Sequence, residues 1–252
     1  MAPTYRVLSF DCLGSTNDEA MAHLKAGDPG DLFIVARRQT GGRGRQGRVW
    51  TSPQGNLYAS LALRDPAPLA LAPQLGFVAG VALARTLRAR LGDDSRLKIK
   101  WPNDAVFAGA KMAGILLESS SLPHGGLGCV IGFGVNCISH PEGLAYATTH
   151  LGAVGAEDTD PDTLVTELGR CFGVELQRWN HGAGFADVRS AWLDMAAGLG
   201  ERIEVAMPTR RLAGVFRDLD SQGRLLIETG SGLTSVDAGD VFLPASAPER
   251  IT

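Results

Sequence analysis

Strand-like apolar segments come in groups along the first 140 residues of this 252-residue chain, with amphipathic segments between the groups. Alternation and apolar runs predict strands over residues 5–10, 32–39, 56–63, 97–101, 105–107, 112–118 and 127–136. The helical period predicts helices over residues 15–27, 73–91, 162–179 and 185–196. Because several strands follow one another without a helix, this order fits an α+β domain with a mixed or antiparallel sheet better than a regular βαβ array.

The hydrophobic pattern of the sequence changes after Gly198-Leu199-Gly200. Short alternating segments, separated by Asp-Ser-Gln-Gly and Gly-Ser-Gly turns, predict four or five strands within about fifty residues. Strands of this length and spacing are typical of a small β-barrel. We therefore expect a large domain over residues 1–198 and a small β domain over residues 199–252.

The segment from Arg37 to Arg48 is densely cationic, with five arginines, four glycines and no acid in a chain of formal net charge −3. The strand-like run Phe33-Ile34-Val35-Ala36 precedes it, and Trp50 closes it. Glycines let the backbone move and approach a ligand closely. A mobile cationic loop that is held at both ends suits a polyanion that is gripped and then released, such as a nucleoside triphosphate.

Other interpretations of this arginine loop compete with nucleotide binding. The spacing Gly42-x-Gly44-x-x-Gly47 matches the dinucleotide-binding fingerprint, which requires a helix to begin at the glycines. Residues 49–53 predict an extended or turning chain instead, so we reject that interpretation. Arginine–glycine tracts that bind RNA are usually long and disordered, whereas this one is a single insert between ordered segments. Taken alone, the loop leaves RNA binding and a plain solvated loop open.

The composition argues against several classes of protein. The near-balance of 24 basic and 27 acidic residues argues against a general nucleic-acid binder. No apolar run is long enough to cross a membrane, and the first residues, Met-Ala-Pro-Thr-Tyr-Arg, lack the apolar core of a signal peptide. The four scattered cysteines argue against a metal site or disulfide framework. These features predict a cytoplasmic protein with free thiols.

Four further motifs carry polar groups that the fold alone does not require. Ser15-Thr16-Asn17 stands at a predicted helix start, where simple capping is the alternative. Lys100-Trp101-Pro102-Asn103-Asp104 follows a strand, and its last three residues are also ordinary turn residues. Lys111 opens an otherwise apolar strand, where a solvated lysine is an equal alternative. Gly132-Phe133-Gly134-Val135-Asn136 ends a buried strand, and its glycines indicate that something approaches the backbone closely.

Taken in order, these motifs resemble those of the biotin–protein ligases. The pattern is Ser-Thr-Asn, Gln-x-x-Gly-Arg-Gly-Arg-x-Gly-Arg-x-Trp, Lys-Trp-Pro-Asn-Asp, Lys-x-Ala-Gly-Ile-Leu and Gly-x-Gly-x-Asn, spread over residues 15–136. The resemblance implies a class II synthetase-like catalytic domain with a mixed or antiparallel sheet, followed by an SH3-like β-barrel.

The resemblance also implies a reaction in two steps. Biotin and MgATP form biotinyl-5′-AMP and pyrophosphate, and a lysine of the biotin carboxyl carrier protein or domain of acetyl-CoA carboxylase, or of a related carboxylase, then takes the biotinyl group. Arg43 and Lys111 would be the catalytic residues. Mg²⁺ would bind mainly through the ATP phosphates, and Asp104 would either contribute to metal binding or orient Lys111.

Further site residues follow from the same resemblance. The residues expected at biotin are Ser15, Thr16, Asn17, Gln39, Gly42, Arg43, Gly44, Arg45, Lys111, Gly114, Gly132 and Gly134. The residues expected at ATP or the adenylate are Arg43, Arg45, Arg48, Trp50, Asn103, Lys111 and Asn136.

Two alternatives to a biotin ligase stay open at this point. One is a lipoate– or octanoate–protein ligase of the same fold, and the other is a non-catalytic protein that binds biotin or RNA. A homodimer is an open possibility. We expect no binding to operator DNA or to membranes, because the first predicted strand begins at Tyr5 and leaves no room for the DNA-binding domain that many bacterial members carry.

Overall fold

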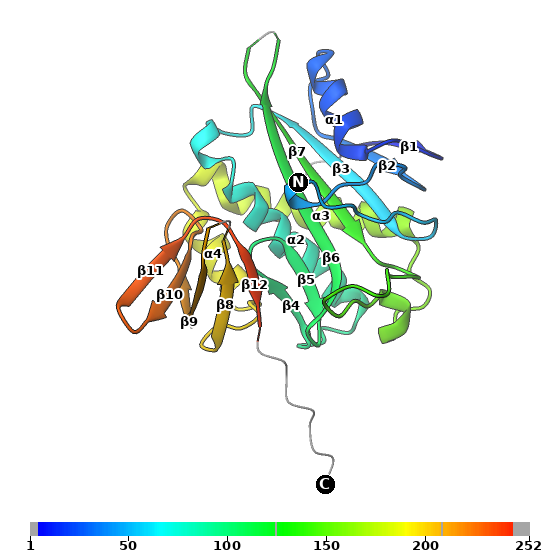
Figure 1. Cartoon of the computed structure of the whole chain (residues 1–252). Helices are drawn as coiled ribbons and strands as arrows, with labels where there is room; N and C mark the ends of the chain where they lie inside the picture. Colours follow the sequence, from blue (N-terminus) through cyan, green and yellow to red (C-terminus); the bar gives the residue numbers. More distant parts are fainter. Residues whose placement is uncertain (1–4, 124, 208, 244–252) are drawn as a thin grey trace.

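The computed structural model describes residues 5–123, 125–207 and 209–243 and contains two sheets, with helices packed against the larger one (Figure 1). Residues 1–4 and 244–252, which belong to the two expected domains, lie outside the described residues. The expected α+β class with a mixed sheet is confirmed.

The larger sheet has seven strands in the order β1-β2-β3-β7-β6-β5-β4. Only β1 and β2 are parallel, because helix α1 (Thr16–Lys25) crosses over between them. Between β5 and β6, Ala108 and Gly109 adopt positive φ values of 48° and 82°, which fits a tight hairpin turn. The strands are β1 (Arg6–Phe10), β2 (Leu32–Ala36), β3 (Leu57–Arg64), β4 (Leu97–Lys100), β5 (Asp104–Phe107), β6 (Ala110–Ser121) and β7 (Leu127–Val135).

Alternation along the central strands divides the core between the two faces of this sheet. In β2, Phe33 and Val35 join the larger core, whereas Leu32 and Ile34 join a smaller core with Ala20 and its neighbours in α1. Helices α2 (Gln74–Arg90), α3 (Pro161–Trp179) and α4 (Phe185–Leu193) pack on the larger core. Helix α1 packs mainly on β2, β3 and β7.

Two predicted elements end three residues earlier than the sequence suggested. The strand expected over 32–39 ends at Ala36, and Gln39 forms only an isolated bridge with Leu13. The helix expected over 185–196 ends at Leu193, because the following chain turns to pair with β4. There the Ile99 N–H donates to the Met195 carbonyl at 2.7 Å, and the Ala197 N–H donates to the Ile99 carbonyl at 2.8 Å.

The smaller sheet is antiparallel, with five strands in the order β11-β10-β9-β8-β12. It packs on the larger unit through shared apolar core, and the Trp101 indole donates to the Gly223 carbonyl at 3.2 Å. Within the described residues, four short 3₁₀ helices cover Arg45–Gly47, Leu69–Leu71, Leu151–Val154 and Asn180–Gly182. The strands are β8 (Arg202–Ala206), β9 (Arg211–Leu219), β10 (Leu225–Thr229), β11 (Gly232–Val236) and β12 (Asp240–Phe242). Of the helices in the described ranges, none combines the length and the apolar character needed to cross a membrane.

Candidate active site

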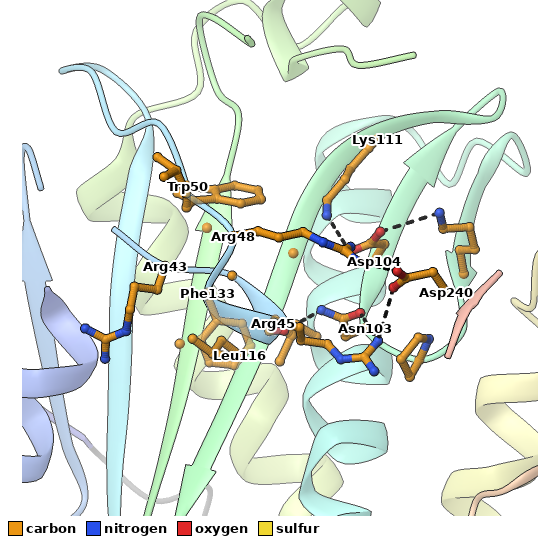
Figure 2. A pocket seen from close by; sticks show the side chains of 18 of the residues that line it. Arg43, Arg45, Arg48, Trp50, Asn103, Asp104, Lys111, Leu116, Phe133 and Asp240 are labelled. Atoms are coloured by element: carbon orange, nitrogen blue, oxygen red, sulfur yellow. Dashed lines mark hydrogen bonds and ion pairs between the residues drawn. The ribbon is translucent and has the colours of Figure 1, made fainter. Parts of the chain in front are cut away.

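A cavity of about 340 Å³ lies where the arginine loop, the start of α1, strands β4–β7 and strand β12 meet (Figure 2). Most of the predicted site residues line it: Ser15, Thr16, Asn17, Gln39, Arg43, Gly44, Arg45, Arg48, Trp50, Asn103, Asp104, Lys111, Gly114, Gly132 and Gly134. Five segments far apart in sequence therefore come together as the motifs suggested.

Uncharged polar groups form one end of the cavity. Ser15 caps α1, and its hydroxyl accepts from the Asp18 N–H at 3.4 Å. The Thr16 N–H and hydroxyl donate to Gln39 Oε1 at 2.8 and 3.1 Å. The fully buried Ser60 hydroxyl lies 2.7 Å from Thr16 Oγ1 and 2.6 Å from Asn17 Oδ1. This network fixes the direction of hydrogen-bonding groups at the cavity wall, and the Asn17 amide extends it to the Glu118 carboxylate, to which it donates at 2.6 Å.

Three glycines on the cavity face of β6 and β7 are in close contact with other side chains. Gly114 and Gly134 are register partners, and the Trp50 indole lies over both. A methyl group at Gly134 would lie 2.5 Å from Trp50 Cε2, and one at Gly132 would collide with the Asn17 amide. The space directly above these glycines is thus filled by Trp50 and Asn17. The Trp50 indole N–H is buried and has no acceptor among the described residues.

The arginine loop forms a small hydrogen-bonded hairpin. The Trp50 N–H donates to the Gly42 carbonyl at 2.9 Å, and the Gly44 N–H donates to the Arg48 carbonyl at 2.7 Å. At its tip, Gln46 has a φ of 58° within the 3₁₀ turn. Residues 49–53 do not form a helix, which agrees with our rejection of the dinucleotide-binding interpretation. The hairpin directs Arg45, Arg48 and Trp50 toward the cavity (Figure 2).

Cations gather at the other end of the cavity. Lys111 Nζ lies 2.7 Å from Asp104 Oδ1, and Lys100 Nζ lies 3.6 Å from Asp104 Oδ2. Arg45 donates to Asn103 Oδ1 at 3.4 Å. Asn103 is itself held by β6, because its amide donates to the Ile115 carbonyl at 2.7 Å. Burial lowers the pKa of Arg45 despite the nearby carboxylates of Asp240 and Asp104.

Arg43 is directed away from this cationic end and toward α1 (Figure 2). Its guanidinium makes two hydrogen bonds of 2.6 Å to the two oxygens of Asp18, and Glu118 lies 3.7 Å away. Hydrogen bonding to Arg43 is the main cause of the lowered pKa of Asp18. In this arrangement Arg43 ties the hairpin to α1, and it is not positioned beside Lys111 as its predicted catalytic role suggested.

The small sheet contributes an unexpected carboxylate, Asp240. Arg48 hydrogen-bonds to Asp240 Oδ2, and Arg45 Nη1 lies 3.9 Å from Asp240 Oδ1. Arg45 also donates to the Gly239 carbonyl at 3.3 Å. Hydrogen bonding to Arg48 is the main cause of the lowered pKa of Asp240.

Two predicted site residues do not line the cavity. Asn136 is buried outside the cavity. Its side-chain amide donates to the Thr149 carbonyl at 3.0 Å, and its backbone carbonyl accepts from the Leu151 N–H at 3.0 Å. It therefore holds the segment that follows β7, and the geometry gives no support for contact with adenine. Gly42 lies outside the cavity lining, and a methyl group added to it would collide with the Trp50 carbonyl.

Several lining residues were not predicted from the sequence. Ile115, Leu116 and Phe133 belong to strands whose residues were anticipated, and Lys100 and Trp101 belong to a recognised motif, so these positions carried a signal. Ala145, Tyr146 and the residues of β12 carried no such signal in the sequence, because only the tertiary fold brings them to the cavity. The unpredicted residues are Val49, Lys100, Trp101, Pro102, Ile115, Leu116, Phe133, Ala145, Tyr146, Asp240, Val241 and Phe242.

The carboxylates at the cavity do not form a metal-binding site by themselves. Both oxygens of Asp104 face lysine ammonium groups, and Asp240 faces two guanidiniums. Within the described ranges, no group of three or more His, Cys, Asp or Glu side chains could hold a metal ion. A divalent cation in this cavity would need most of its ligands from a bound phosphate and from water.

Comparison with known families matches both parts of the chain. Residues 9–136 match the Biotin/lipoate A/B protein ligase family, and residues 198–243 match the Biotin protein ligase C terminal domain. The biotin–[acetyl-CoA-carboxylase] ligase of Paracoccus denitrificans is 39% identical over 236 residues, which cover 90% of this chain and 96% of that protein. The same-named protein of Mycobacterium tuberculosis is 31% identical and covers 90% and 85% of the two chains.

Solved structures agree with the fold. The biotin protein ligase of Aquifex aeolicus, solved in complex with biotin and ATP, superposes with a TM-score of 0.82 at 24% identity, covering 95% of this chain and 98% of that one. The Leishmania major biotin protein ligase in complex with biotinyl-5-AMP gives a TM-score of 0.67 at 23% identity, covering 94% and 100%. With two family models matched in order and a relative of 39% identity along almost its whole length, the chain belongs to the biotin protein ligase family.

Proposed function

We propose that this chain activates biotin with ATP and transfers the biotinyl group to a lysine of a biotin carboxyl carrier domain. A biotin carboxylate oxygen attacks the α-phosphorus of ATP, the bond to the β-phosphate oxygen breaks, and pyrophosphate leaves. The lysine amine then attacks the carbonyl carbon of biotinyl-5′-AMP, loses a proton, and AMP leaves. This is the reaction of a biotin–[acetyl-CoA-carboxylase] ligase.

The two-ended character of the cavity is the observation that carries this proposal. Its uncharged hydrogen-bonding end, at Ser15, Thr16 and Gln39, suits the ureido ring of biotin. Apolar Leu116, the register partner of Gly132, and the Trp50 ring also line the cavity, and the thioether ring and valeryl chain would pack against them. The cationic end would then receive the carboxylate and the phosphates. Only a ligand that is polar, then apolar, then anionic satisfies all three parts.

The first step needs positive charge because a carboxylate must approach a polyphosphate of the same sign. Lys111, Lys100, Arg45 and Arg48 supply that charge from three different segments. Lys111 lies beside the Trp50 ring, with its ammonium 5.4 Å from the ring centroid, and therefore stands where the apolar part of the cavity meets the cationic part. We assign Lys111 to the carboxylate and the reacting phosphate.

The arginine hairpin would protect the adenylate, which is prone to hydrolysis. Trp50 covers the strand glycines, and its buried indole N–H has no acceptor among the described residues. Exclusion of water from a reactive mixed anhydride is the usual purpose of such a cover. Arg43 would contribute to this cover by attaching the hairpin to α1 through its two hydrogen bonds to Asp18.

Magnesium would reach the site on the ATP phosphates. The described residues present carboxylates that are already paired with cations, so we assign Mg²⁺ to phosphate and water ligands. Asp104, which is bound to Lys111, is assigned to orienting that lysine.

A lipoate or octanoate ligase is the second candidate, because the matched family includes lipoate ligases. The polar network around Thr16, Gln39 and Ser60 argues against it, since an aliphatic chain or a dithiolane ring would cover these polar groups without hydrogen-bonding to them. ATP–pyrophosphate exchange in the presence of biotin, lipoate or octanoate tests this choice. We expect exchange with biotin at micromolar concentration and none with the other acids, whereas exchange with lipoate alone would overturn the proposal.

A further inference from the structure

Strand β12 places one carboxylate of the small sheet against the arginine hairpin. Asp240 pairs in register with Ala206 of β8, and the next residue, Val241, is 4% exposed and pairs with Val205. Asp240 and Val241 both line the cavity, and Val241 is also part of the apolar core, so β12 is anchored beside the cavity where the Asp240 carboxylate meets the hairpin. Asp240 is therefore held on a regular strand, and its side chain is only 29% exposed.

Two guanidiniums of the hairpin converge on this carboxylate (Figure 2). Arg48 hydrogen-bonds to one oxygen, and Arg45 lies 3.9 Å from the other. Arg45 is further fixed by the Gly239 carbonyl at 3.3 Å. The tip of the hairpin is thus attached to the small sheet, while its base is attached to α1 through Arg43 and Asp18.

These two arginines are among the cations that the proposed function assigns to the ATP phosphates. A guanidinium binds carboxylate and phosphate oxygens with the same planar donor geometry. Donors that are engaged by Asp240 are not free for a phosphate, and an unpaired carboxylate beside a triphosphate would repel it. The carboxylate and the triphosphate therefore compete for the same groups.

We propose that Asp240 is a positioning residue that occupies Arg45 and Arg48 as an internal substitute for phosphate, so that ATP must displace it. The inference rests on the proposed function, since it requires ATP as the ligand. Any interaction that is made before ATP binds and lost afterwards lowers the affinity for ATP by the same free energy. The small sheet thereby sets the affinity for ATP and orders the hairpin before the nucleotide arrives.

The direct test is the KM for ATP in biotin-dependent pyrophosphate exchange by the full chain. Asp240→Asn keeps the shape of the side chain and removes its charge, so the KM for ATP should fall by about three- to tenfold, with the biotin affinity unchanged. Asp240→Glu keeps the charge and should stay close to the parent. Asp237→Asn is the matched control, because Asp237 is 81% exposed and its carboxylate lies 3.8 Å from Arg224 instead of the hairpin.

A double-mutant cycle separates competition from a merely structural role. In an Arg48→Ala background, Asp240→Asn should lower the KM for ATP by much less than in the parent, because the main partner of the carboxylate is gone. A KM for ATP that rises or stays unchanged in Asp240→Asn would overturn the inference. So would an equal effect of Asp240→Asn in both backgrounds.

Trypsin provides a readout that does not depend on the reaction. Without nucleotide, Asp240→Asn should be cleaved faster after Arg45 and Arg48 than the parent or Asp237→Asn, because the hairpin tip has lost its attachment. Equal cleavage of all three proteins would contradict the attachment. A parent with no biotin-dependent exchange would instead contradict the proposed function, and the trypsin result would still decide whether Asp240 holds the hairpin.

Discussion

Lys111 and Asp104 form a close ion pair, with 2.7 Å between Nζ and Oδ1, where the apolar and cationic parts of the cavity meet. Asp104 is 9% exposed and lies on β5, and its register partner is Gly114 on β6, the strand that also carries Lys111. Two adjacent strands therefore fix the ammonium group relative to the carboxylate. This pair fixes the position of the Lys111 ammonium group, which we propose meets the reacting phosphate.

Replacing Lys111 should affect catalysis more than binding. Lys111→Ala removes the charge that meets the developing negative phosphate, so adenylate formation should fall by about 100- to 10,000-fold. Biotin affinity, measured by calorimetry, should weaken much less because the ureido end is untouched. Pyrophosphate exchange close to that of the parent would show that Lys111 is not the group that stabilises the transition state.

Replacing Asp104 tests whether it orients Lys111. Asp104→Asn leaves the lysine without its anionic partner, so kcat for exchange should fall by about tenfold, which is less than the loss in Lys111→Ala. Asp93→Asn is a suitable control, since that carboxylate is 85% exposed and lies outside the cavity. If Asp104 instead supplied an essential metal ligand, raising the Mg²⁺ concentration would restore the lost rate; we expect no such rescue.

The close approach of Trp50 to β7 predicts that Gly134 tolerates no side chain. The added methyl group of Gly134→Ala would lie 2.5 Å from Trp50 Cε2, so the indole must move and the cavity must change shape. Biotin affinity should fall by about tenfold or more. Gly76→Ala is the matched control, because its methyl group meets nothing within 4 Å in α2 and should leave biotin binding unchanged. Equal affinities for the two variants would contradict the packing described here.

Detaching the base of the hairpin should release the reactive intermediate. Arg43→Gly and Asp18→Asn both break the double hydrogen bond between the loop and α1, so each should leak biotinyl-5′-AMP. Because this mixed anhydride reacts with free amines, bystander proteins would then become biotinylated, which a streptavidin blot detects. Asp11→Asn, at a carboxylate that is 97% exposed, should not leak. Unchanged acceptor specificity in both detached variants would contradict the role of the hairpin as a cover.

Acidification should loosen the segment that carries Tyr146. The Nδ1 atoms of His140 and His150 are 2.7 Å apart, so one of them must be unprotonated to accept the hydrogen bond. Burial, and then the charge of His140, lower the pKa of His150. The folded protein therefore binds fewer protons at this residue than the unfolded chain does, and stability should be lost as the pH falls below the ordinary histidine value of about 6.5.

Thermal unfolding between pH 7.5 and pH 5 measures this effect. The His150→Gln variant should lose less of its Tm over that range than the parent, because it no longer has the imidazole with the lowered pKa. An identical dependence on pH in both proteins would contradict the lowered pKa of His150.

The sequence predicted the order of the elements well because each signal was local. The apolar runs of β2 and β7 and the capping hydroxyl of Ser15 report on short segments, and the structure confirms them. The end of α4 could not be predicted in this way, because the pairing of Ala197 with Ile99 depends on β4, about a hundred residues earlier.

The same limit applies to the site. The motifs indicated the cationic and polar groups, but the partners of the arginines depend on how the chain folds back. Asp240 carries no motif, and it reaches Arg48 only because β12 pairs with β8 beside the cavity. Asn136 stands in a recognised motif, yet its side-chain amide and backbone carbonyl hydrogen-bond to residues 149 and 151 outside the cavity.

Transfer of biotin to a carrier lysine is the measurement that tests the central claim most directly. The full chain is incubated with biotin, ATP, Mg²⁺ and a biotin carboxyl carrier domain, alongside the same domain with its acceptor lysine changed to arginine. Intact-mass spectrometry should show one added biotinyl group on the first domain and none on the second, with one AMP and one pyrophosphate released per group transferred. An unmodified carrier domain, or modification with lipoate instead of biotin, would contradict the account.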